Sequence, residues 1–218
     1  PQTVTWKSSN TAVATVKDGV VTATGKGTAK ITASLPNGRS AVCTVKVTTK
    51  KLPTSGYSYA STAQYTGSAI IPTVTVKDGS KVLRQNIDYR VMVTNNVKIG
   101  HANIAISGMG NYYGSYSAGF DIIPAKQTIQ KLETRYKGFF VDWAQKGSAT
   151  GYEIQYATNS KFTNAKKVTI TNNKTDKTTI SKLSGNEKYY VRVRSYTTVN
   201  GTKYYGAWSV SKSVTTKK

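Results

Sequence analysis

The sequence predicts an all-β protein built from tandem β-sandwiches. No window keeps the apolar spacing of an amphipathic helix, and alternation with a period of two residues recurs instead. Turn dipeptides separate the alternating runs at intervals of about 8 to 12 residues, which is typical of sandwiches. Charged residues make up only 18% of the 218 residues. Thr, Ser, Asn and Tyr must therefore supply much of the polar surface.

Three alternating runs define the clearest strands. In the first, the face that we expect to be buried carries Ala41, Cys43, Val45 and Val47. A buried free cysteine usually behaves as a small apolar side chain. In the second, the expected core face carries Tyr152, Ile154 and Tyr156. In the third, the expected outward face carries Tyr190, Arg192, Arg194 and Tyr196.

Four dipeptides supply the residues with positive φ that tight hairpins need. They are Asp18-Gly19, Asn37-Gly38, Asp78-Gly79 and Asn200-Gly201. Each lies between two alternating runs, so each predicts a β-hairpin.

Two proline-containing stretches, 50–56 and 123–126, are predicted linkers, and they divide the chain into segments 1–49, 50–124 and 125–218. Pro124 ends a strand, because proline cannot donate to a central ladder. The short linkers favour a semi-rigid, elongated rod of three domains. The charge is uneven: the third segment holds 18 basic and 5 acidic residues, which is +13 of the total +22.

The composition argues against several classes of enzyme and metalloprotein. The chain has one cysteine and one histidine, His101, so an intrachain disulfide, a cysteine zinc site and a multi-histidine metal site are excluded. Of its nine acidic residues, Asp18 and Asp78 lie in predicted turns, and Glu153 is expected to pair across strands with Arg192 or Arg194. We expect no catalytic site, metal or cofactor. No apolar run approaches the roughly 20 residues of a membrane span.

The first segment resembles the bacterial Ig-like group 2 domain. The matching residues lie at 4–10, 13–16, 19–23 and 27–33. The resemblance implies that Trp6 is a core residue and that further strands precede it. We therefore expect this sandwich to be incomplete at its N-terminal side: either Pro1 is an internal cut in a longer protein, or a neighbour supplies the missing strand.

The second segment resembles an Ig-like repeat of surface proteins from Gram-positive anaerobes. The resemblance rests on Tyr65-Thr66-Gly67, on Asp88-Tyr89 and on residues 108–114 and 120–122. It implies a second Ig-like fold.

The third segment resembles a fibronectin type III domain. Trp143 matches an early strand, and Leu183 with Tyr189 matches the tyrosine corner, whose hydroxyl holds a connecting loop. The motifs at 151–156, 189–194 and 204–209 resemble the tails of large secreted clostridial proteins. This resemblance implies an extracellular protein, either secreted or attached to the cell surface.

Two kinds of residue suggest ligand binding. Tyrosines that need no burial can stack on sugar rings, and they include Tyr112, Tyr113, Tyr204 and Tyr205. The strong positive charge attracts polyanions. We expect the basic patch to consist of Tyr190, Arg192, Arg194 and Tyr196, with the lysines at 161, 166, 167, 174, 177 and 203.

The sequence thus predicts a non-catalytic extracellular array that acts as a spacer or adhesion region. Its expected partners are an anionic cell-wall polymer or glycan and further domains of the same parent chain. We expect no nucleic-acid partner, because no motif for nucleic-acid binding accompanies the charge. Two alternatives stay open: a carbohydrate-binding accessory region of a secreted glycan-degrading enzyme, and a structural subunit that exchanges strands.

Overall fold

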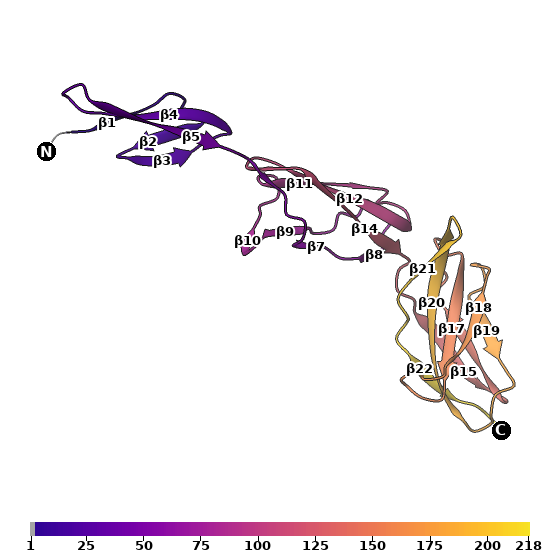
Figure 1. Ribbon diagram of the computed structural model, residues 1–218. Coiled ribbons are helices and arrows are strands. Elements are labelled where there is room, and N and C mark those ends of the chain that lie inside the picture. The colour runs from indigo at the N-terminus through magenta and orange to yellow at the C-terminus, as the bar shows by residue number, and fades with distance from the viewer. Residues whose placement is uncertain (1–2) are drawn as a thin grey trace. The chain divides into compact units, whose positions relative to one another are not determined.

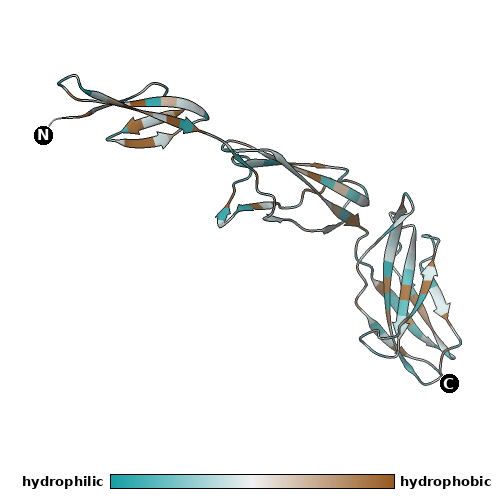
Figure 2. Cartoon of the chain, in the orientation of Figure 1, coloured by the Kyte–Doolittle hydropathy of each residue, from teal (hydrophilic) through white to brown (hydrophobic). Residues whose placement is uncertain are grey.

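A computed structural model describes residues 3–218 and contains strands but no helix within that range (Figure 1). The all-β prediction is therefore confirmed. Apolar and polar residues alternate in bands along the strands, as the period of two requires (Figure 2). No helix in the described part of the chain is long and apolar enough to cross a membrane.

The described chain divides into two compact units. One holds the residues up to Ser58 together with Val74–Met92 and Ala105–Ser117, and the other holds Tyr59–Thr73, Val93–Ile104 and Ala118–Lys218. The predicted boundaries near residues 50 and 125 remain predictions. The strands are described below in chain order.

The first five strands form two small sheets. The strands are β1 (Thr5–Ser8), β2 (Ala14–Lys17), β3 (Val20–Ala23), β4 (Gly27–Ser34) and β5 (Ser40–Val47). One sheet has the order β1-β4-β5, and β2 pairs with β3 in the other. The core between them is small and consists of Val13, Ala14, Ala29 and Ile31. Partly buried residues that pack against this core are Val16, Val45 and Val47.

Two core predictions in this region are wrong. Trp6 is 37% exposed, and Cys43 is also exposed. Both residues lie on the predicted face, since Trp6 pairs with Ala33 and Cys43 pairs with Ile31. The packed core gathers around Ala29, Ile31, Val45 and Val47. Beyond it, a shallow groove stays open along Val4, Ala33, Leu35, Arg39, Ser40 and Ala41.

The next nine strands form one sheet of four strands and two smaller sheets, of three and two strands. They are β6 (Lys50–Lys51), β7 (Tyr57–Ser58), β8 (Thr62–Gln64), β9 (Thr75–Asp78), β10 (Lys81–Val82), β11 (Tyr89–Thr94), β12 (Gly100–Gly108), β13 (Tyr112–Tyr113) and β14 (Ser115–Ile123). The largest sheet has the order β11-β12-β14-β8, and its β8 runs parallel to β14.

The predicted linker at 50–56 is partly built into the fold. Lys50 and Lys51 form β6, which pairs in parallel with Tyr112 and Tyr113 of β13. Leu52 follows at 4% exposure. Beyond β6, the Leu52 amide donates to the Tyr113 carbonyl and the Gly56 carbonyl accepts from the Lys77 amide. Only one side chain of this stretch is buried, which explains its polar composition. The second predicted linker does follow a strand, since β14 ends at Ile123.

The last eight strands form a sandwich. They are β15 (Ile129–Arg135), β16 (Gly138–Trp143), β17 (Gly151–Ala157), β18 (Lys166–Ile170), β19 (Lys177–Ile180), β20 (Lys188–Val199), β21 (Thr202–Tyr205) and β22 (Lys212–Thr215). One sheet has the order β15-β16-β19. The other follows β18-β17-β20-β21, and β22 also pairs with β20.

The core of this sandwich confirms the predicted inward positions. Trp143, Tyr152 and Ile154 are fully buried, and Tyr156 and Tyr189 are 8% exposed. The tyrosine corner is also present, because the Tyr189 hydroxyl accepts a hydrogen bond from the Ser184 amide at 3.4 Å. This bond holds the loop before β20 against the core.

The four turn dipeptides all connect paired strands, as predicted. In Asp18-Gly19 both residues have positive φ, of 50° and 80°, and in Asn200-Gly201 the values are 49° and 81°. This is the geometry of a two-residue hairpin whose twist matches that of its strands.

Candidate binding face

The outer face of the five-stranded sheet brings together the predicted patch. Along β20, Tyr189, Val191, Val193 and Ser195 point toward the core, so Tyr190, Arg192, Arg194 and Tyr196 share the other face. The predicted alternation is therefore confirmed. Tyr190, Arg192 and Arg194 are half-buried rather than freely exposed. Other side chains on this face cover them.

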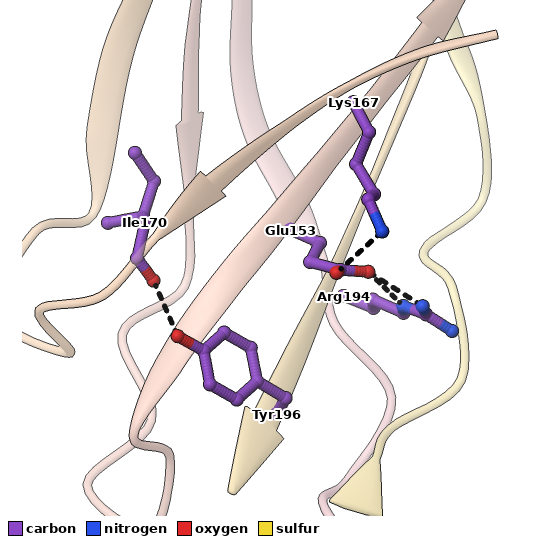
Figure 3. A network of polar contacts seen from close by, with 5 residues as sticks. All are labelled: Glu153, Lys167, Ile170, Arg194 and Tyr196. Atoms are coloured by element: carbon purple, nitrogen blue, oxygen red, sulfur yellow. Dashed lines mark hydrogen bonds and ion pairs between the residues drawn. The ribbon is translucent and has the colours of Figure 1, made fainter. Parts of the chain in front are cut away.

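Arg194 is held by Glu153 on the neighbouring strand β17, as predicted. Its Nε and Nη2 atoms donate to Glu153 Oε2 at 2.9 and 2.6 Å, and Lys167 Nζ lies 3.1 Å from Oε1 (Figure 3). Glu153 is only 1% exposed. Burial alone would raise the pKa of Glu153, but the hydrogen bonds from Arg194 and Lys167 outweigh it and hold that pKa below its usual range.

The two arginines stack with three aromatic rings. The Arg192 guanidinium lies 4.0 Å from the centre of the Phe162 ring and 4.7 Å from that of Trp208. The Arg194 guanidinium lies 4.4 Å from Trp208 and 3.9 Å from Tyr205. We call these five residues the arginine–aromatic stack. Cation–π contacts of this kind contribute about 0.5 to 2 kcal/mol each.

The two guanidinium groups differ in how they are paired. Arg192 Nε donates to the amide oxygen of Gln155 at 2.7 Å, whereas Arg194 binds a carboxylate. No carboxylate among the described residues forms an ion pair with Arg192. Burial, together with the charge of Arg194, lowers the pKa of Arg192 from its ordinary value. Arginine stays protonated in proteins, so Arg192 presents a positive charge that no carboxylate balances.

Tyr196 is the part of the predicted patch that is wrong. It is 2% exposed, because its ring covers Gly151 and its hydroxyl donates to the Ile170 carbonyl at 3.4 Å (Figure 3). The ammonium group of Lys203 lies 4.6 Å from the centre of the Tyr196 ring. Tyr196 therefore supports the face and offers little surface to a ligand.

The two tyrosine pairs predicted to bind sugars, Tyr112–Tyr113 and Tyr204–Tyr205, differ in exposure. Tyr112 is 6% exposed, against expectation, and its hydroxyl donates to Asp78 Oδ2 at 3.1 Å, where Lys50 Nζ lies 2.6 Å away. Tyr113 is 52% exposed. Tyr205 belongs to the arginine–aromatic stack, and Tyr204 is half-buried beside it in the chain. Of these four tyrosines, only Tyr113 has a largely exposed ring.

The remaining cations add charge around the stack. Lys188 Nζ lies 5.2 Å from the centre of the Tyr190 ring. The lysines predicted to surround the patch are all exposed: Lys161, Lys166, Lys167, Lys174, Lys177 and Lys203. Two of them do not belong to this face, because Lys177 begins β19 of the other sheet and Lys174 lies in the segment between β18 and β19. Within the face itself, Glu153 faces Lys167 and Arg194 and offsets only part of their charge. The face can therefore attract an anion.

Phe162, Trp208 and Gln155 were not predicted as site residues. Phe162 lies in a turn after β17, and Trp208 lies in the irregular segment after β21. Strand alternation carries no information about either segment. The one available signal was the abundance of aromatic residues near two outward arginines.

The one histidine of the chain lies outside the binding face. His101 is exposed on β12, and its Nδ1 atom lies 2.8 Å from Asp121 Oδ1 on β14. Within residues 3–218, no three His, Cys, Asp or Glu side chains cluster closely enough to hold a metal ion.

Comparisons with known families identify the module types. Residues 2–36 match the family model of the intimin immunoglobulin-like domain, and residues 127–211 match that of the fibronectin type III domain. The chain thus carries an intimin-like Ig domain at its N-terminal end and a fibronectin type III domain near its C-terminal end. Modules of these two classes are generally non-catalytic and are typical of extracellular proteins.

One curated relative matches a short stretch. Over 48 residues the chain is 58% identical to a lacto-N-biosidase of Bifidobacterium bifidum. The match covers 22% of this chain and 4% of that protein. The chain therefore spans a small fraction of the relative's length.

Two solved structures share a distant likeness with the chain. The FN1–FN3 domains of chicken CNTN1 are 14% identical with a TM-score of 0.40, and the match covers 88% of this chain and 78% of that one. A β-1,2-glucanase of Parabacteroides distasonis is 16% identical with a TM-score of 0.36, covering 54% and 18% of the two chains.

Proposed function

We propose that this chain is a non-catalytic module array of a bacterial surface or secreted protein, and that it spaces a partner domain and adheres to anionic polymers. The Ig-like and fibronectin type III modules support the spacer role. The outer face described above supports adhesion. The anionic polymer is a wall teichoic acid or an acidic glycan, and the parent protein belongs to a Gram-positive cell.

One observation carries the adhesive role: Arg192 has no carboxylate partner although Phe162 and Trp208 hold it in place. Its Nε atom donates to the Gln155 side chain, so the two Nη groups are available to a ligand. A stacked guanidinium loses little conformational freedom on binding, so an oxyanion meets a prearranged donor. Arg194 is already neutralised by Glu153 and contributes mainly to the stack.

Co-sedimentation with Gram-positive cell walls tests this role. The chain is mixed with intact walls and with walls stripped of teichoic acid, across a series of salt concentrations. We expect binding to need teichoic acid and to fade as salt rises. Arg192→Gln should weaken binding about tenfold, since hydrogen bonds between charged groups contribute about 1.5 to 3 kcal/mol.

The matched control is Lys174→Gln, which removes an exposed charge from the same domain. It should change binding much less than Arg192→Gln does. Circular dichroism and thermal melting confirm that both variants fold. Equal effects of the two variants would show that total charge alone matters, and binding that ignores salt would contradict the electrostatic role.

A second candidate is an accessory region of a glycan-degrading enzyme. The 48-residue match to a lacto-N-biosidase favours it. This role predicts binding to neutral oligosaccharides that is insensitive to salt and that is lost in Tyr113→Ala, because Tyr113 keeps an exposed ring. A glycan array read at low and high salt distinguishes the two candidates.

A further inference from the structure

The turn between β17 and β18 encloses a second potential binding site, separate from the arginine–aromatic stack. A groove of about 290 Å³ lies under this turn. Its lining residues are Tyr156, Ala157, Thr158, Asn159, Thr163, Asn164, Lys166 and Tyr189. Phe162 belongs to the same turn but stacks on Arg192 instead. The turn therefore serves two surfaces.

The floor of the groove is aromatic. The rings of Tyr156 and Tyr189 lie 6.2 Å apart at 64° to each other, and each residue is 8% exposed. The Tyr189 hydroxyl accepts from the Ser184 amide, whereas the Tyr156 hydroxyl has no hydrogen-bond partner within residues 3–218. A hydroxyl group in this setting is free to bind a polar ligand.

The rim of the groove is polar and preformed. The Asn159 side chain donates to the Thr163 carbonyl and accepts from its amide, both at 3.0 Å. Asn164 has a φ of 55°, a conformation that asparagine tolerates better than most residues. These features fix the turn before any ligand arrives, which reduces the entropy lost on binding.

The charge at the rim is a single cation. Lys166 begins β18 directly opposite Tyr156, and its side chain is exposed. No described carboxylate lies within ion-pair distance of Lys166. The side chains of Thr158 and Asn164 likewise form no hydrogen bond with the described residues. The Lys166 ammonium, the Asn164 amide and the Thr158 hydroxyl therefore lie around an aromatic floor, to which Tyr156 adds its own hydroxyl.

We propose that this groove binds a single sugar residue that bears a carboxylate, such as a uronic or sialic acid. Pockets for larger ligands usually measure about 300 to 1,000 Å³, so a groove of about 290 Å³ suits one ring rather than a chain. The sugar ring fills the groove above Tyr156 and Tyr189, and because each is only 8% exposed, the polar groups at the rim supply most of the contacts. Lys166 binds the carboxylate, and the Tyr156 hydroxyl and the Asn164 amide bind hydroxyl groups of the ring.

Two-dimensional ¹H–¹⁵N NMR of the whole chain tests this assignment. Sodium glucuronate and sodium N-acetylneuraminate are the two acidic probes, and they distinguish the two sources of carboxylate. Glucose controls for the ring without charge, and sodium acetate controls for charge without the ring. We expect shifts confined to residues 156–166 and to Tyr189 with at least one acidic sugar, at millimolar concentration, and much smaller shifts with both controls.

Four variants sharpen the test. Lys166→Gln should weaken binding of the acidic sugar at least fivefold, and Tyr156→Phe should weaken it while the rest of the spectrum stays folded. Lys177→Gln, an exposed lysine outside the groove, should have no effect. Arg192→Gln should also leave this binding intact, which separates the groove from the wall-binding face. Absent shifts, shifts centred on Arg192, or equal binding of glucose would overturn the proposal.

Discussion

Glu153 and Arg194 lie directly opposite each other on β17 and β20, and one carboxylate oxygen accepts both guanidinium bonds. Glu153 is buried, whereas the Arg194 side chain is 22% exposed and stacks between Trp208 and Tyr205. The pair therefore joins the two central strands to Tyr205 at the end of β21 and to Trp208 after it.

Removing the charge of Glu153 should destabilise the fibronectin type III domain. Glu153→Gln leaves the half-buried Arg194 without a charged partner, and breaking a buried ion pair costs about 3 to 5 kcal/mol. Guanidinium unfolding followed by tryptophan fluorescence measures the loss. Glu133→Gln is the matched control, because Glu133 pairs with Lys131 and Arg135 at the surface and should matter far less. Equal losses would mean that the buried pair is not special.

Lowering the pH should weaken the same Glu153–Arg194 pair and so lower the stability of the fold. The pKa of Glu153 is lower in the folded chain than in the unfolded chain, whose glutamates titrate near about 4.3. The contribution of Glu153 to stability is therefore complete above that pH and is lost as the pH falls further, through the lower folded pKa. We expect the melting temperature to fall below about pH 4. Glu153→Gln should flatten this fall, and an unchanged pH profile would contradict it.

Gly151 should not tolerate a side chain. An added Cβ would meet the carbonyl oxygen of Ile170 and would lie 2.7 Å from the Tyr196 hydroxyl. Gly151→Ala should therefore cost about 1 to 3 kcal/mol, as overpacking usually does. Gly147→Ala is the control, since its Cβ would meet nothing within 4 Å. Thermal melting of the two variants checks the difference, and similar melting temperatures would refute it.

The Tyr152 hydroxyl should stabilise two loops. It accepts from the Lys146 amide at 2.8 Å and donates to the Asn173 carbonyl at 3.1 Å. Tyr152→Phe leaves both groups without this partner, so a loss of about 1 to 3 kcal/mol is expected. Tyr136→Phe, at a residue that is 69% exposed, should change stability little. Denaturant unfolding measures both, and a neutral Tyr152→Phe would show that water replaces the hydroxyl.

Cys43 should react in the folded protein. Its side chain is exposed, so a thiol reagent such as dithionitrobenzoate should modify it fully without denaturant. Cys43→Ser provides the blank. A thiol that reacts only after unfolding would show that something covers this face in solution.

Strand alternation predicted the faces of β17, β20 and β5 correctly, because side-chain direction is a local property of an extended chain. The pairing of Glu153 with an arginine of β20 followed from the same rule and from the resemblance to a known sandwich. The four hairpins followed from glycine at positions that need positive φ.

Burial depends on what covers a face, and alternation does not contain that information. Cys43 lies on the predicted side of β5, directly opposite the core residue Ile31, but its side chain is exposed and is not part of that small core. Tyr196 lies on the outward side of β20 but is covered because Gly151 leaves room for its ring. Phe162 and Trp208 join the binding face from irregular segments, where no periodicity guides a prediction.

The parallel pairing of β8 with β14 has a mechanical consequence. Thr62, Ala63 and Gln64 pair in the same direction as Asp121, Ile122 and Ile123. A pull that draws the start of β8 and the end of β14 in opposite directions slides the two strands along each other. All of the hydrogen bonds between them are then loaded together, whereas an antiparallel hairpin opens one bond at a time. Under tension the chain should resist extension at this pair, and single-molecule stretching would record it as a distinct force peak.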